Sequence, residues 1–265
     1  MSVPTVSQWD MSDVWDPDQY NRFAAERELP FWDLVALIQT GPGLRLADLG
    51  CGDGRLTATL HDRLQASTTV GVDRSAAMIG AAEGHAGGAV TFELGDIGDW
   101  CRPGSFDVVF ANASLQWVPD HPAALSRWVD SLRPAGQVAV QVPANADHPA
   151  HQLAAEVAAA WLADPPPDPV AENVLAPEAY CQLLDDLGCG QQHVRLQVYP
   201  YRLASTAAVV EWVKGTTLNR FKPCFDAESW EQFVAQYRER LVGALGDRSP
   251  YLYAFKRILL WGRLP

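Results

Sequence analysis

The sequence of 265 residues lacks the features of several special classes of protein. No apolar run approaches the roughly 20 residues that cross a membrane, and the polar, acidic N-terminus has no signal-peptide core. A net charge of −12 leaves no excess of the cations that a nucleic-acid partner requires. Five scattered cysteines, an odd number, argue against a disulfide framework. We therefore expect a cytoplasmic monomer or homodimer that binds a small molecule and neither nucleic acid nor membrane.

Apolar runs that end in turn residues indicate buried strands of an α/β fold. Residues 44–49 are mostly apolar, end in alternating glycines and are followed by leucines at helical spacing. This pattern predicts a parallel strand, a tight turn and a crossover helix. Residues 69–73 form a second such run, with Asp73 at its C-terminal end. Because an acid at that place can bind the two hydroxyls of a ribose, the pattern predicts a nucleotide-type cofactor.

The spacing of the glycines indicates which cofactor. A dinucleotide fingerprint would need its third glycine at position 55, where the chain has Arg55. The glycines instead alternate after Asp48, and this disfavours the alternative of an NAD-dependent oxidoreductase. Two further strand-like runs follow at 90–94 and 106–112, the first of them continued by Gly-Asp-Ile at 95–97.

Taken together, these signals resemble the motifs of the class I S-adenosylmethionine (SAM) methyltransferases. The resemblance implies a Rossmann-like α/β fold with a seven-stranded mixed sheet, whose last strand is antiparallel, and a small helical cap. It also implies SAM as the cofactor, with S-adenosylhomocysteine as the product. The cofactor-binding residues that it implies are Asp48, Gly50, Cys51, Gly52, Gly54, Asp73, Arg74, Met78, Asp96, Ile97, Asn112, Ala113 and Trp117, with Tyr20 and Arg27 from the N-terminal segment.

The N-terminal segment, residues 1–43, precedes the SAM-binding domain at 44–265. Tyr20, Phe23 and Arg27 fall on one face of a predicted helix. Two interpretations remain open for this face. It could pack on the sheet as an ordinary amphipathic helix, or it could close over the cofactor with Arg27 pairing the methionine carboxylate.

A narrower resemblance covers nearly the whole chain. Residues 112–121 read Asn-Ala-Ser-Leu-Gln-Trp-Val-Pro-Asp-His, and residues 15–20 read Trp-Asp-Pro-Asp-Gln-Tyr. Both segments are similar to the trans-aconitate 2-methyltransferase family. This resemblance implies methylation of a carboxylate of a small organic acid, with trans-aconitate as the leading substrate and a monomethyl ester as the product. The short loop at 246–250 and Lys256, in place of an arginine, depart from the family pattern.

A carboxylate acceptor needs no base, because it is already ionised at neutral pH. We therefore expect no required catalytic acid or base, with Tyr20 and Trp117 walling the reaction centre. His121 is a weak candidate for a base, because Asp120 is expected to cap a helix and leave His121 half exposed. His148 and His151 have ligand-like spacing but no evident carboxylate or cysteine nearby, so we expect no metal site.

The substrate-binding part is expected near residues 205–246, where two helical patterns lie between the last two strands. Such an insertion covers the ligand-binding edge of the sheet, so we interpret it as a substrate cap. A tricarboxylate needs cations, and Arg220 and Lys222 are the leading candidates, followed by Arg195, Arg202, Lys214 and Lys256. The resemblance adds Trp117, Asn145 and Tyr180 as substrate contacts. The proline tract at 164–169 is predicted to be a stiff linker.

Two alternatives remain open for the function. The aromatic-rich cap would also suit a methyltransferase of the same lineage that acts on another small molecule or secondary metabolite. A hydroxyl or amine acceptor would then need a base. The chain could also be a catalytically inactive SAM-binding partner subunit, although the intact cofactor motifs argue against loss of the cofactor.

Overall fold

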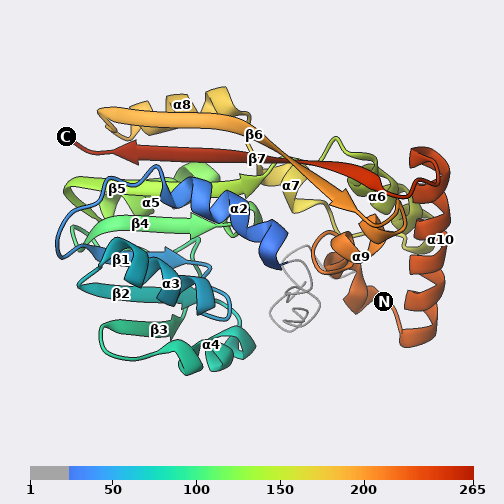
Figure 1. Cartoon of the computed structure of the whole chain (residues 1–265), viewed down its shortest axis with the longest axis horizontal. Coiled ribbons are helices and arrows are strands. Elements are labelled where there is room, and N and C mark those ends of the chain that lie inside the picture. Colours follow the sequence, from blue (N-terminus) through green and yellow to red (C-terminus); the bar gives the residue numbers. More distant parts are fainter. Residues whose placement is uncertain (1–23) are drawn as a thin grey trace.

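Seven strands form one sheet in the order β3-β2-β1-β4-β5-β7-β6 (Figure 1). The computed structural model describes the backbone of residues 24–265 and the side chains from Glu28 onward. β7 runs antiparallel to both of its neighbours, β5 and β6, so the expected mixed sheet is confirmed. The strands are β1 Arg45–Leu49, β2 Thr68–Asp73, β3 Val90–Leu94, β4 Phe106–Asn112, β5 Leu132–Pro143, β6 Gln191–Leu203 and β7 Tyr251–Arg263.

The helices cover both faces of the sheet and one end of it (Figure 1). Short polar caps fix several of their starts: Ser75 accepts a hydrogen bond from the Met78 amide, and Asp120 accepts one from the Ala123 amide, as predicted for Asp120. The helices are α2 Ala24–Val35, α3 Arg55–Leu64, α4 Ala76–Ala82, α5 His121–Asp130, α6 Pro149–Trp161, α7 Pro169–Asn173, α8 Pro177–Asp186, α9 Ala208–Lys214 and α10 Ala227–Leu245, with 3₁₀ turns η2 Glu83–His85, η3 Leu115–Trp117 and η4 Asn219–Cys224.

Alternate residues of the central strands enter separate hydrophobic cores. On β4, Val108 and Phe110 pack on the side of α2 and α3, whereas Val109 and Ala111 pack on the side of α5 and α8. This alternation follows from the two-residue period of a strand. Because both faces are covered, the central strands are mostly apolar, and that explains the apolar runs of the sequence.

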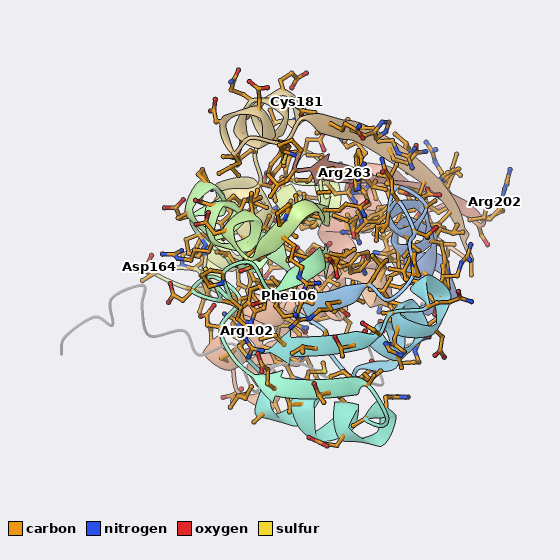
Figure 2. All side chains as sticks on the ribbon, turned by 90° about the vertical axis from the view of Figure 1, so that its left-hand side faces the viewer. Arg102, Phe106, Asp164, Cys181, Arg202 and Arg263 are labelled. Atoms are coloured by element: carbon orange, nitrogen blue, oxygen red, sulfur yellow. The ribbon has the colours of Figure 1, made fainter. Side chains whose placement is uncertain are left out.

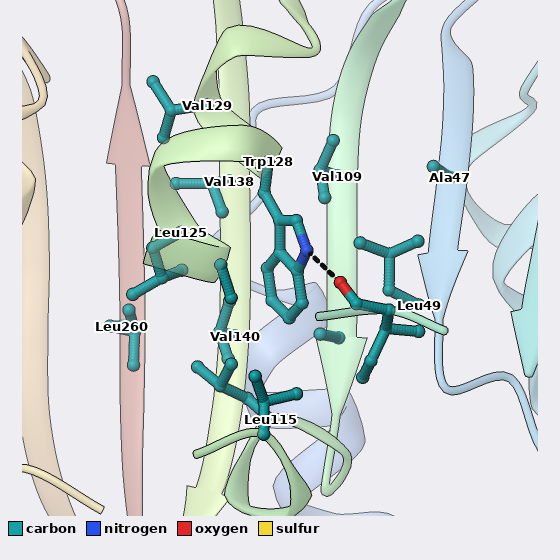
Figure 3. Packing of buried hydrophobic residues seen from close by; sticks show 14 of the residues in the cluster. Ala47, Leu49, Val109, Leu115, Leu125, Trp128, Val129, Val138, Val140 and Leu260 are labelled. Atoms are coloured by element: carbon teal, nitrogen blue, oxygen red, sulfur yellow. Dashed lines mark hydrogen bonds between the residues drawn. The ribbon is translucent and has the colours of Figure 1, made fainter. Parts of the chain in front are cut away.

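Trp128 of α5 is the largest fully buried side chain in the core on the α5 side. It is fully buried against Val109, Val138 and Val140, and its Nε1 donates a 2.8 Å hydrogen bond to the carbonyl of Ile97 (Figure 3). This bond joins α5 to the segment that follows β3. Trp128 thus helps to hold the loops at the carboxyl ends of the strands.

A separate hydrophobic core holds the cap. The strands β6 and β7 are 13 residues long and pair over their full length, so their outer halves project beyond the central sheet (Figure 1). There they pack with α9 and α10, and also with α6. The cap therefore includes more of the chain than the insertion at 205–246.

One boundary differs from the sequence-based expectations. The proline tract at 164–169 is predicted to be a stiff linker, but Pro169 already begins α7, and Asp168 caps this helix by accepting a hydrogen bond from the Val170 amide. Within the described residues, no helix combines the length and apolarity needed to cross a membrane.

Replacement of Trp128 by Phe should lower the free energy of unfolding by roughly 1–3 kcal/mol, because it opens a void and leaves the Ile97 carbonyl unpaired. Urea unfolding followed by circular dichroism measures this loss. Trp161→Phe is the control, since that indole is 37% exposed and bonds Gln236 at the surface. Equal losses in the two variants would contradict the role given to Trp128.

Candidate functional site

A cavity of about 750 Å³ opens at the carboxyl ends of the parallel strands. This is the edge where open α/β sheets bind ligands. The turn after β1, the end of β2 and the segments after β3 and β4 line it. Of the residues predicted to bind the cofactor, it brings together Asp48, Gly50, Cys51, Gly52, Asp73, Arg74, Met78, Asp96, Ile97, Asn112, Ala113 and Trp117.

The glycine turn after β1 has two different tasks. Gly50 has a φ of +80°, and a Cβ there would lie 2.2 Å from Ser114 Cβ, so this glycine lets the loops after β1 and β4 touch. Gly52 also has a positive φ, but nothing lies within 4 Å of a Cβ built on it. Its bare backbone is therefore open to a ligand. Gly54 is not among the lining residues; a Cβ there would clash with Phe92, so we assign Gly54 to packing rather than to cofactor contact.

Asp73 is held in a fixed orientation at the end of β2. Its Oδ2 accepts a 3.0 Å hydrogen bond from the Gly52 amide, and its Oδ1 accepts a 2.9 Å bond from the Ser75 amide. Each carboxylate oxygen retains a second lone pair, so the group can still accept bonds from two ribose hydroxyls. Asp96 is similarly fixed by the Gly98 amide, beside the buried Ile97.

Asp48 is a buried acid beneath the turn. It is 4% exposed, and its Oδ2 accepts a 2.5 Å hydrogen bond from Thr57 Oγ1. Burial raises the pKa of Asp48 to about 7, with a further contribution from the charge of Asp73. Burial also raises the pKa of the Cys51 thiol well above its usual range, so Cys51 acts as a small apolar wall residue.

The residues of this cavity fit SAM. The open backbone at Gly52 and the fixed carboxylates of Asp73 and Asp96 suit the amino-acid, ribose and adenine parts of the molecule. Asn112 provides a further acceptor, because its buried Oδ1 has no hydrogen-bond partner within the described part of the chain. An unpaired buried polar atom is costly unless a ligand satisfies it.

A smaller cavity, of about 60 Å³, adjoins the first beneath the cap. Ala113, Trp117, Pro169 and Arg220 line both cavities and so mark their junction. Trp117 therefore lies where the two cavities meet, and its predicted role as a wall of the reaction centre stays a prediction. The remaining polar residues of the smaller cavity are Gln116, His151, Asp168, Thr216, Thr217 and Arg257.

Arg220, on η4, is the buried cation at this junction. It is 3% exposed, and its Nη1 lies 3.2 Å from Asp168 Oδ2. Among the residues that the structure describes, its Nε and Nη2 have no hydrogen-bond partner. Arg220 therefore keeps donors for an anionic ligand.

Asp168 joins Arg220 to His151. Its Oδ2 accepts a 2.8 Å hydrogen bond from His151 Nδ1. Burial by itself would raise the pKa of Asp168, but the bond from His151 and the charge of Arg220 outweigh it and lower that pKa to about 2. Asp168 is thus ionised at every physiological pH.

Two predicted substrate contacts are internal to the protein. Tyr180 is fully buried, with its hydroxyl 2.6 Å from His121 Nδ1 and bonded by the Leu175 amide. Asn145 is also fully buried, and its Oδ1 accepts a hydrogen bond from the Lys256 amide. Neither residue lines the two cavities, and their role as substrate contacts stays a prediction.

His121 is buried rather than half exposed, with only 1% of its surface accessible. Burial lowers its pKa to about 4, and it lines neither cavity, so the structure gives it no role as a base. Tyr20 lies outside the described residues. Arg27 lies on α2, but its side chain is not among those described, so closure over the cofactor stays a prediction.

Most of the other candidate cations are engaged elsewhere. Lys222 is exposed and lines neither cavity, and Arg202 projects from the edge of the molecule (Figure 2). The predicted role of Lys222 in substrate binding stays a prediction. The three remaining cations form ion pairs with nearby acids: Arg195 with Asp33, Lys214 with Glu211 and Lys256 with Asp147.

The sequence-based reasoning missed Asp168, Arg257 and the histidine that contacts Asp168. His151 was expected to lack a carboxylate neighbour, but Asp168 is its partner. The signal that was available is the acid directly before Pro169, which is typical of a helix N-cap rather than of a linker. His148 caps α6, and the described residues contain no group of three metal-ligating side chains.

Comparisons with known proteins agree with this geometry. Residues 46–136 match the model of a methyltransferase domain. The chain is 39% identical to trans-aconitate 2-methyltransferase of Deinococcus radiodurans, over 95% of this chain and 99% of that protein. It is also 39% identical to the protein of that name in Streptomyces avermitilis, over 86% and 88% of the two chains, and 35% identical to the one in Mycobacterium tuberculosis, over 93% and 95%.

Solved structures share the fold at lower identity. The YcgJ protein of Bacillus subtilis superposes with a TM-score of 0.60 at 13% identity, covering 89% of this chain and 98% of that one. Phosphoethanolamine N-methyltransferase 2 of Haemonchus contortus, in complex with SAM, gives a TM-score of 0.59 at 18% identity, covering 97% of this chain and 60% of that one. At these identities the likeness concerns the fold alone.

Asp48→Asn should change how stability depends on pH. The pKa of Asp48 is about 7 in the folded protein and near its ordinary value of 3.8 in the unfolded chain. Between pH 3.8 and pH 7 the carboxyl is therefore protonated in the folded state and ionised in the unfolded state. The wild type therefore loses stability as pH rises through this window. Asparagine does not titrate and can still accept from Thr57. Its stability relative to wild type should rise by up to about 4 kcal/mol from pH 4 to pH 8.

Urea unfolding of both proteins across this pH range measures that difference, in which the titrations of other groups cancel. A difference that stays constant with pH would show that the buried carboxyl is not protonated in the folded state.

Asp73→Asn should weaken binding of S-adenosylhomocysteine about 10- to 100-fold, because it removes a charged acceptor for the ribose hydroxyls. Isothermal titration calorimetry gives the affinity. The matched control is Asp62→Asn, an exposed acid on α3 that does not line the cavity. Unchanged affinity in the Asp73 variant would contradict the assignment of this carboxylate.

Proposed function

We propose, from the premise that this chain belongs to the trans-aconitate 2-methyltransferase family, that it methylates a carboxylate of trans-aconitate to give a monomethyl ester. The enzyme is a SAM-dependent methyltransferase. The observation that carries the proposal is Arg220, a buried cation with unused donors at the junction between the cofactor cavity and the smaller cavity.

The residues of the larger cavity would hold SAM for an in-line transfer. When bound, SAM supplies a methyl group on a positively charged sulfur. Asp73 would bind its ribose, Asp96 and Ile97 its adenine, and Gly52 would offer bare backbone to the remainder. Positioning of two reactants in this way can supply about 7–11 kcal/mol of the barrier.

The smaller cavity would hold the carboxylates. Since the acceptor is already an anion at neutral pH, the protein has to orient it and exclude water, and it needs no base. Arg220 and Arg257 are two buried cations that line this cavity, 3% and 8% exposed. A planar guanidinium suits a carboxylate because it can donate two parallel hydrogen bonds. Trp117, at the junction, would separate the acceptor from solvent.

The free cysteine thiols support the cytoplasm as the location of this reaction. All five cysteines are free, although burial varies among them. Free thiols persist in reducing compartments, and this supports the cytoplasm as the place where the enzyme acts.

Arg220→Ala should weaken binding of trans-aconitate to the protein saturated with S-adenosylhomocysteine by about 100-fold or more, because it removes a buried charge-assisted donor. Arg220→Lys should fall between this variant and the wild type, since it keeps the charge but loses the planar fork. Calorimetric titration of trans-aconitate into the loaded protein measures both.

Lys222→Ala is the matched control, a cation two residues away that is exposed and lines neither cavity. Thermal melting and binding of S-adenosylhomocysteine verify that each variant is folded. Equal weakening by the Arg220 and Lys222 variants would indicate a diffuse charge effect. A loaded protein that does not bind trans-aconitate would direct the search to another small-molecule acceptor.

A further inference from the structure

A hydrogen-bonded chain of three side chains leads from a buried carboxylate to the wall of the smaller cavity. Asp168 Oδ2 lies 2.8 Å from His151 Nδ1, and His151 Nε2 lies 3.3 Å from Thr217 Oγ1. His151 and Thr217 are 6% and 8% exposed, and all three residues line the cavity. The three hydrogen-bonded side chains come from α6, the proline tract and the turn after α9, and they connect these segments on the acceptor side.

The proton positions on His151 follow from its partners. Asp168 is ionised, so it can only accept, and Nδ1 must carry the proton that it receives. Nε2 then has two states. It accepts from the Thr217 hydroxyl when the ring is neutral, and it carries a second N–H when the ring is charged. The second state would offer a donor to an anion in the cavity.

The charges that surround His151 do not balance a tricarboxylate. Arg220 from η4 and Arg257 from β7 line the same cavity as cations, and Asp168 offsets one of them. The other titratable neighbour is His148 on α6, whose pKa burial lowers to about 4, so it contributes no charge near neutral pH. Within the part of the chain that the structure describes, three carboxylates would therefore meet a net charge of one. An uncompensated buried charge is expensive, so a further cation beside these arginines would stabilise the bound tricarboxylate.

We propose that His151 is the third cationic partner of the acceptor, and that it takes up a proton as the tricarboxylate binds. This proposal rests on the proposed function. Nε2–H then donates to a carboxylate of the ligand, while Nδ1–H stays on Asp168. The ionised Asp168 stabilises the charged ring in the same way that the aspartate of a Ser-His-Asp triad stabilises the imidazolium of its histidine.

The proposal gives a definite sign to the pH dependence. Imidazoles change charge between about pH 5 and pH 8, whereas carboxylic acids of the ligand type titrate near pH 4. Affinity for trans-aconitate should therefore fall as pH rises through the imidazole range, although the ligand itself is already ionised there. By linkage, binding at a fixed pH in that range must take up protons.

The test is calorimetric titration of trans-aconitate into wild-type protein loaded with S-adenosylhomocysteine, in phosphate and in Tris buffer near pH 7. These buffers differ in their enthalpy of ionisation, so a difference in observed enthalpy counts the protons taken up. The product cofactor is used because it lacks the sulfonium charge. We expect a net uptake of protons when trans-aconitate binds the wild type, and no uptake in His151→Asn.

His151→Asn is the informative variant because its amide nitrogen can still donate to Asp168 but does not titrate. Its affinity should be about tenfold weaker than that of the wild type, because the asparagine cannot become the charged donor that the ligand contacts. His193→Asn is the matched control, since His193 is exposed on β6 and lines neither cavity. It should keep the wild-type uptake.

Each outcome decides between the two proposals. Binding to the wild type without proton uptake overturns the role of His151 and leaves the proposed function in place. Uptake that persists in His151→Asn also overturns it, because the proton then goes to another group or to the ligand. If that variant does not fold, the wild-type uptake and its pH dependence still decide. Absence of any trans-aconitate binding overturns the proposed function, and this proposal with it.

Discussion

The acceptor side of the molecule depends on one largely buried carboxylate, that of Asp168, whose side chain is 10% exposed. Its partners, His151 and Arg220, come from α6 and η4, which are far apart in the sequence. Desolvation alone would favour the neutral acid, but two donors keep it ionised. Asp168 thereby fixes the proline tract against the cap and orients the arginine at the junction of the two cavities. A buried ion pair of this kind adds little net stability but strongly specifies one arrangement of its segments.

The cofactor side is built differently, mostly from the backbone. Gly50 lets two loops approach within contact distance, and Ser114 Oγ completes this approach by donating a 2.6 Å hydrogen bond to the Leu49 carbonyl. Main-chain amides then orient the carboxylates of Asp73 and Asp96. These constraints act over a few residues at the ends of neighbouring strands. The two halves of the site thus meet at Trp117, but main-chain contacts shape the cofactor side and side-chain ionic contacts shape the acceptor side.

This difference explains what could be predicted from the sequence. The strands β3 and β4 have the predicted boundaries, and most of the predicted cofactor residues line one cavity. Local signals were sufficient there, because strand period, glycine spacing and the place of an acid at a strand end are readable in a single sequence. The full length of β6 and β7 was not readable, since it depends on their pairing with each other and on the cap core.

The acceptor side could be predicted only in part. Arg220 and Lys222 are the leading candidates from the sequence, and of the two Arg220 lines the cavities, whereas Tyr180 and Asn145 are internal polar residues whose partners lie far along the chain. The sequence predicts Asp168 to be part of a linker, whereas in the structure it lies between His151 and Arg220. Contacts of this kind arise from tertiary packing, so a local sequence pattern does not predict them.

The most direct test of the central claim is turnover with SAM and trans-aconitate, followed by mass spectrometry of the organic acid. Joined cofactor and acceptor cavities predict that trans-aconitate gains one methyl group as an ester while an equal amount of S-adenosylhomocysteine forms. If the protein binds the cofactor but returns trans-aconitate unchanged at saturating concentrations of both, the smaller cavity is not a tricarboxylate site and the account of the acceptor side is wrong.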